Sequence, residues 1–232
     1  MVDLGETNFY IAIPSLPQHE LEKYSTNLFD EWESYIEKTL KLPDYALSLQ
    51  VEEGSIKGSA KIAAVLGALY LGIGQYGSFI SGLQTIKGQI SSIGDFLGSQ
   101  AKAPFPSTKP KVKKHFGSLG QLHKLFMKVQ QGKITANQAI IAAEVILGEE
   151  VSDSPDFMKK LKTTIKETPP QAQQLTLSFD SFAQHFTAST SEKKQQPRKP
   201  RPKPESPINQ QYRIEVWRES KQEKRKFRLV KI

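Results

Sequence analysis

The residues with the clearest chemical potential are basic and aromatic side chains near the C-terminus. A proline-rich tract carries closely spaced cations, and the segment after it adds two arginines and a tryptophan. Arginine and lysine neutralise phosphates, and an aromatic ring beside them can stack a nucleobase. The candidate residues for binding a nucleic acid or a nucleotide are Lys193, Lys194, Arg198, Lys199, Arg201, Arg213, Trp217 and Arg225.

These candidates also have simpler interpretations. Trp217 can pack against the rest of the protein, which is the commoner role of a large aromatic side chain. The basic tract within residues 189–208 can be an extended linker, because its prolines and charges disfavour a packed core. Both interpretations stay open from the sequence alone.

The distribution of charge supports an anionic partner. The net charge is +8, but residues 1–61 carry 5 Lys and Arg against 11 Asp and Glu. The remainder is therefore strongly basic. A basic half suggests nucleic acid, a nucleotide or lipid headgroups, although it can also be a solvated surface.

The sequence offers no convincing catalytic or metal centre. The four histidines lack metal-ligand spacing, and the absence of cysteine excludes thiolate chemistry. Residues 72–77 spell GxGxxG, but the strands that a dinucleotide site needs are not predicted around them. We therefore expect no enzymatic activity, no metal and no cofactor.

The elements around these residues predict an α+β fold. Residues 9–13 have strand composition, residues 18–40 show helical periodicity, and residues 45–51 alternate as a half-buried strand. Four helices are expected between residues 117 and 186, with Thr135 capping the second. Residues 210–232 alternate as a hairpin that would add to another sheet.

These patterns divide the chain into six segments. They comprise a strand-helix-strand unit, a long glycine-rich hydrophobic helix, a Pro/Lys linker, a helical bundle, a basic Pro-rich linker and a terminal β-hairpin. Their expected bounds are residues 1–54, 55–98, 99–116, 117–188, 189–208 and 209–232.

One apolar run dominates the middle of the chain. The 25 residues between Lys61 and Lys87 contain no charged side chain. A helix of that length can cross a hydrocarbon layer of about 30 Å. Glycine, which disfavours helices in water, recurs in the run and is more frequent in membrane helices. The run therefore predicts a transmembrane helix, with a buried helix of a protein core as the alternative.

The second part of this run has a polar side. Small or uncharged hydrogen-bonding groups recur along it and would find poor partners in lipid. In an oligomer they could face a water-filled axis. The candidate pore-lining residues are Gln75, Ser78, Gly82, Thr85 and Gln89.

Two segments carry a resemblance to a known family. GSIKGSAKI at residues 54–62, followed by ALYLGIGQYGSFISGL at residues 68–83, resembles the transmembrane effector of Hailong-type bacterial antiphage systems. The resemblance covers at most the first 100 residues. It implies an oligomeric ion channel, controlled by a nucleic-acid ligand that a partner nucleotidyltransferase makes.

The leading hypothesis is therefore a membrane-associated effector in antiphage defence. It would oligomerise with copies of itself in lipid, form a ligand-gated pore in the bacterial inner membrane, and keep its other parts cytoplasmic. The alternative is a soluble nucleic-acid-associated accessory protein, in which the apolar run is a core helix and the basic residues bind the ligand.

Overall fold

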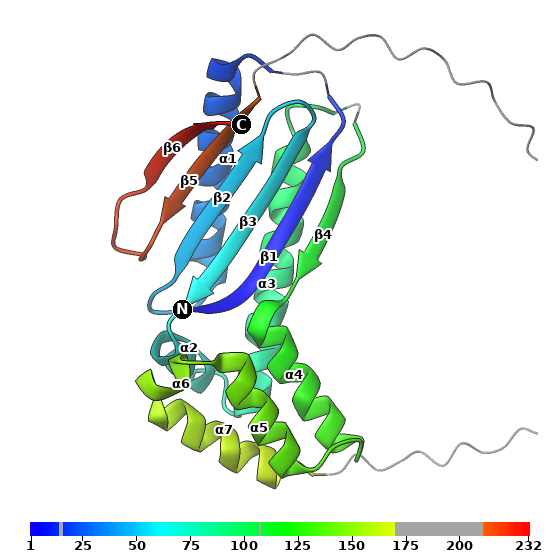
Figure 1. Cartoon of the computed structure of the whole chain (residues 1–232), viewed down its shortest axis with the longest axis vertical. Helices are drawn as coiled ribbons and strands as arrows, with labels where there is room; N and C mark the ends of the chain where they lie inside the picture. Colours follow the sequence, from blue (N-terminus) through cyan, green and yellow to red (C-terminus); the bar gives the residue numbers. More distant parts are fainter. Residues whose placement is uncertain (14–15, 107, 170–210) are drawn as a thin grey trace, which may run out of the picture. The chain divides into compact units, whose positions relative to one another are not determined.

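An antiparallel sheet organises the computed structural model, which describes residues 1–13, 16–106, 108–169 and 211–232 (Figure 1). Within these residues the sheet has six strands in the order β4-β1-β3-β2-β5-β6. The strands are β1 (Val2–Ile11), β2 (Ala46–Glu52), β3 (Ile56–Ala64), β4 (Lys111–His115), β5 (Tyr212–Arg218) and β6 (Lys226–Lys231).

The helices complete an α+β fold, which confirms the predicted class. They are α1 (Gln18–Thr39), α2 (Leu66–Gly74), α3 (Phe79–Lys102), α4 (Gly117–Gln130), α5 (Ala136–Leu147), α6 (Glu150–Asp153) and α7 (Pro155–Glu167). Elements β1, α1, β2, β3, α3 and β4 follow the β-α-β-β-α-β order of a ferredoxin-like unit. The C-terminal hairpin extends that unit at the outer edge of β2.

Helices α1 and α3 cover one face of the sheet. Alternation along β2 turns Leu47, Leu49 and Val51 into the core between the sheet and these helices. The two helices also bind each other: the rings of Tyr35 and Phe96 stack with centroids 4.0 Å apart. Within the described residues, these two helices lie on one face of the sheet and do not cover the opposite face.

The apolar run is divided among three elements, so the prediction of one helix over residues 55–98 is wrong. Residues 56–64 form β3, where every second residue is buried. Helix α2 has 9 residues and ends at a turn in which Gly77 has a φ of 80°. Nine residues rise about 14 Å, far less than a bilayer core of about 30 Å.

Because the single long helix predicted over residues 55–98 does not form, the predicted membrane span is not formed either. None of the described helices combines the length and the hydropathy needed to cross a bilayer. The predicted transmembrane helix, ion channel and inner-membrane location are therefore wrong. The long side chains of the run instead fill the core, where Leu69, Leu83 and Ile86 are fully buried.

A cluster of helices packs at one end of the sheet. Phe79 at the start of α3 contacts the rings of Phe126 on α4 and Phe157 on α7. Thr135 and Gln138 form a capping box at the start of α5, which confirms the predicted cap. The fourth predicted helix and the predicted linker at residues 189–208 lie outside the described residues. The predicted Pro/Lys linker at residues 99–116 contains a strand, β4, which the sequence analysis did not predict.

Stability should depend on pH through His123 of α4. Burial lowers the pKa of His123, and the charge of Lys87 lowers it further. The folded protein therefore resists protonation that the unfolded chain accepts near pH 6.5, so stability is lost as the pH falls below about 6.5. We expect His123→Gln to reduce this loss. Denaturant unfolding of both proteins on either side of that pH tests it, and identical pH profiles would contradict it.

Candidate nucleic-acid interface

The sheet face opposite α1 and α3 exposes side chains from all six strands. Figure 1 looks onto this face, with α1 and α3 behind the strands. Helix α4 reaches only the start of β1, where Gly117 lies against Asp3. Over the rest of the strands, the described helices leave this face uncovered.

Strand register arranges these side chains in three rows across the sheet. Residue pairs from β4 to β6 define each row. The first row is His115, Glu6, Lys61, Ser48, Trp217 and Lys226; the second is Lys113, Asn8, Ser59, Gln50, Glu215 and Arg228; the third is Lys111, Tyr10, Lys57, Glu52, Arg213 and Val230. We call these eighteen residues the open face.

Two of the three carboxylates on the open face are neutralised by neighbours. Glu6 accepts a hydrogen bond of 2.9 Å from Ser59 and lies 3.7 Å from the Lys61 ammonium. Burial raises the pKa of Glu6, but hydrogen bonds from Ser59 and Asn8, with the charges of Lys61 and His115, outweigh it and lower the pKa overall. Glu52 accepts a hydrogen bond of 2.9 Å from Nε of Arg213.

An excess of positive charge remains after these pairs are removed. Within the described residues, four cations of the open face form no ion pair, namely Lys57, Lys111, Lys113 and Arg228. The carboxylate of Glu215 is the one acidic group left to oppose them there. The face therefore favours an anion that can touch several strands at once.

Two aromatic side chains stand among these cations. Tyr10, on β1, donates a hydrogen bond of 3.3 Å to Ser55. Trp217, on β5, lies on the opposite side of its strand from buried Ile214 and Val216. Hydrogen bonds from Lys226 and Trp217 lower the pKa of Glu219. The Trp217 side chain is half-buried, so part of its ring surface is open to solvent.

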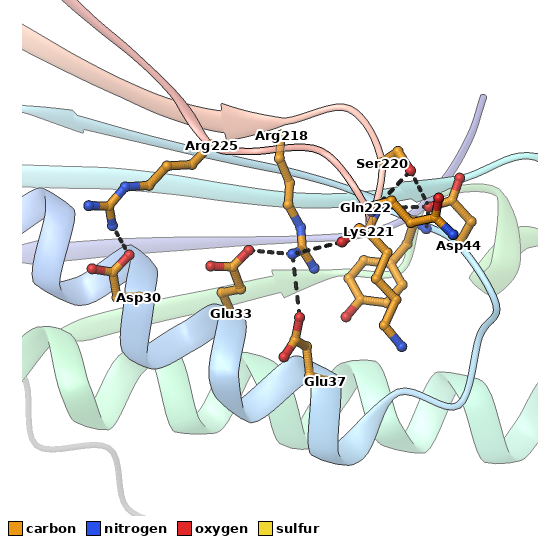
Figure 2. Close-up of polar contacts among 10 residues, drawn as sticks. Asp30, Glu33, Glu37, Asp44, Arg218, Ser220, Lys221, Gln222 and Arg225 are labelled. Atoms are coloured by element: carbon orange, nitrogen blue, oxygen red, sulfur yellow. Dashed lines mark hydrogen bonds and ion pairs between the residues drawn. The ribbon is translucent and has the colours of Figure 1, made fainter.

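Arg218 anchors the hairpin that presents Trp217. Its side chain points the other way, toward α1, and is 4% exposed (Figure 2). The guanidinium lies 2.5 Å from Glu33 and 3.4 Å from Glu37, with its centre 5.2 Å from the ring centroid of Tyr45. Burial raises the pKa of Glu33, and Glu37 adds to the rise, while Arg218 opposes it. Desolvation therefore offsets much of the attraction within this cluster.

Asp44 holds the turn after β5. One oxygen of its carboxylate accepts hydrogen bonds from the Ser220 hydroxyl at 2.9 Å and the Lys221 amide at 2.7 Å (Figure 2). Arg225 forms an ion pair with Asp30 of α1. The contacts of Arg218 and Arg225 thus fix the hairpin to α1 on the covered side of the sheet. The side chains on the opposite side of the hairpin, including Trp217, therefore keep their positions on the open face.

The structure brings together only some of the predicted binding residues. Arg213 and Trp217 lie on the open face, but Arg225 points toward α1 and does not. Lys193, Lys194, Arg198, Lys199 and Arg201 lie outside the described residues. The sequence interpretation missed the lysines of β4, because the prolines around residues 104–110 suggested a linker. It also missed Tyr10, because only the pairing of β1 with β3 and β4 places that ring on the open face.

The predicted pore residues have structural positions instead. Gln75 follows α2, and Thr85 is exposed on α3. Ser78 caps α3 by accepting a hydrogen bond from the Ser81 amide, and Gln89 donates to the Tyr76 hydroxyl at 2.8 Å. Gly82 is buried, and a Cβ there would lie 2.7 Å from the Ile73 carbonyl oxygen. These residues terminate, cap and pack helices rather than line one channel.

Comparisons of the chain with protein-family models, curated proteins and solved structures find no match. The resemblance at residues 54–83 thus remains a prediction. No three metal-ligating side chains gather within residues 1–13, 16–106, 108–169 and 211–232. Within the described residues, the open face is the surface whose charge and aromatic side chains indicate a ligand.

Proposed function

We propose that this protein binds nucleic acid through the open face of its sheet. The observation that carries the proposal is the excess of four unpaired cations over one unpaired carboxylate among the described residues of the open face, spread over strands β3, β4, β5 and β6. This pattern matches a ligand with regularly repeated negative charge, because each phosphate can approach a different cation.

The neighbouring polar groups support the same ligand. Asn8, Ser59 and Gln50 lie between Lys113 and Arg228 in the middle row. Amide and hydroxyl groups can donate and accept hydrogen bonds, as nucleobase edges and sugars require. A binding site for a small anion would need fewer amide and hydroxyl groups, and it would occupy a smaller area of the sheet.

Neutralising three lysines of the open face should flatten the salt dependence of binding. We expect the combined variant Lys57→Gln, Lys111→Gln and Lys113→Gln to reduce the slope of log affinity against log salt by about 2 to 3. Each lost phosphate contact removes about 0.7–0.9 from that slope. Fluorescence anisotropy with a labelled oligonucleotide, at several salt concentrations, measures it in the full chain.

A matched variant controls for net charge. Lys159, Lys160 and Lys166 are exposed on α7 and form no ion pair among the described residues. Replacing all three with glutamine changes the net charge equally but leaves the open face intact, so the slope should stay near that of the wild type. Equal slopes for the two triple variants would contradict binding at the open face.

A further inference from the structure

We infer that the open face takes single-stranded rather than double-stranded nucleic acid, with Tyr10 and Trp217 stacking unpaired bases. This inference rests on the proposed function. It concerns the kind of nucleic acid and the side chains that contact its bases.

The two rings lie at separate positions on the open face. Tyr10 and Trp217 occupy different rows and are separated by β3 and β2. Three strand spacings give about 14 Å across the sheet, and four residues along the strands give about 14 Å more. The resulting diagonal of about 20 Å lets one strand of several nucleotides reach both rings, as in single-strand sites of about 4–16 nucleotides.

Stacking on these rings also requires bases whose flat surfaces are accessible. A ring can stack on a base only when the face of that base is free, and in a duplex the neighbouring base pairs cover it. Aromatic rings on an exposed sheet are the arrangement that single-strand binding uses, because every base has a flat surface to offer. Duplex binding would use the cations of the open face and leave both rings without a role.

Hydrogen-bonding groups lie between the two rings. Ser59 and Gln50 adjoin each other across β3 and β2, inside the diagonal from Tyr10 to Trp217. Gln50 is exposed and offers both a donor and an acceptor. Splayed bases can present their edges to such groups, whereas the edges of paired bases lie in the grooves.

Tryptophan fluorescence reports on this site directly. The chain has two tryptophans, and Trp32 is 1% exposed in the core. A quenching of emission on ligand addition therefore reports on Trp217. We expect a single-stranded oligonucleotide to quench the emission and a duplex of the same length to leave it nearly unchanged.

Ring substitutions complete the test. Trp217→Leu should weaken single-strand binding by about 5- to 150-fold, the range for losing one stacked base, and Tyr10→Leu by a similar factor. Trp217→Phe should keep most of the affinity and lose the fluorescence response. Phe227→Leu is the matched control: Phe227 lies on the same hairpin, 47% exposed, but faces the covered side with Val216. Its affinity should not change.

The outcomes separate the two proposals. If duplex binds as tightly as single strand and Trp217→Leu has no effect, the single-strand inference is overturned while binding at the open face stands. If neither nucleic acid binds in a salt-dependent way, both are overturned. Salt-independent self-association through the same face, seen by sedimentation, would instead identify the open face as a protein interface.

Discussion

Replacing Arg218 with methionine should lower the free energy of unfolding by about 3–5 kcal/mol, the range for removing one partner of a buried ion pair. The side chain is 4% exposed and lies between Glu33, Glu37 and the ring of Tyr45. Its loss leaves two carboxylates facing each other near a partly buried site. Denaturant unfolding followed by far-UV circular dichroism measures the change.

Two further variants show whether the loss is electrostatic. Arg213→Met removes an arginine of the same strand whose partner Glu52 is half-exposed, and it should cost at most about 1 kcal/mol. Combining Arg218→Met with Glu33→Gln and Glu37→Gln should restore part of the stability, because no unpaired charge then remains. A triple variant less stable than Arg218→Met alone would show that the cluster acts through packing instead.

Two alanine substitutions in α3 should have opposite effects. Alanine is better than glycine in a helix by about 0.8–1 kcal/mol, so Gly88→Ala should stabilise, as nothing lies within 4 Å of its new Cβ. At Gly82 the same methyl group would lie 2.7 Å from the backbone oxygen of Ile73. Overpacking of this kind costs about 1–3 kcal/mol and should exceed the gain in helix propensity.

The quantity to compare is the free energy of unfolding of Gly82→Ala with that of Gly88→Ala. Both add one methyl group to one helix, so their unfolded states change alike and the contrast isolates the contact between α2 and α3. Thermal or denaturant unfolding of the pair measures it. Gly82→Ala as stable as Gly88→Ala would mean that α2 and α3 can separate at little cost, contrary to the close packing seen here.

Strong periodic patterns were sufficient to predict the elements at the front of the chain. The predicted helix at residues 18–40 corresponds to α1, and the predicted strand at residues 45–51 corresponds to β2. The terminal hairpin was also predictable, because Ile214 and Val216 alternate with polar residues. In each case large apolar side chains distinguish one period from the other.

Strand β3 was not predicted, because its small residues do not distinguish a strand period from a helical period. Ala60 and Ala64 are four residues apart, a spacing that satisfies both a strand period of two and one face of a helix. Only cross-strand pairing with β1 and β2 decides between them. The burial of Arg218 was also unpredictable, because it depends on long-range partners: the carboxylate of Glu37, for example, lies 181 residues away in the sequence.

The attachment of the hairpin to β2 also sets an order of events during synthesis. Arg213 is separated from its partner Glu52 by 161 residues. At a translation rate of about 5–20 residues per second, the ribosome needs roughly 8–30 seconds to make that stretch. Throughout this time β2 is an outer strand whose backbone groups have no partner on one side. A nascent chain of this protein is therefore most prone to aggregate at β2, and the arrival of β5 ends that exposure.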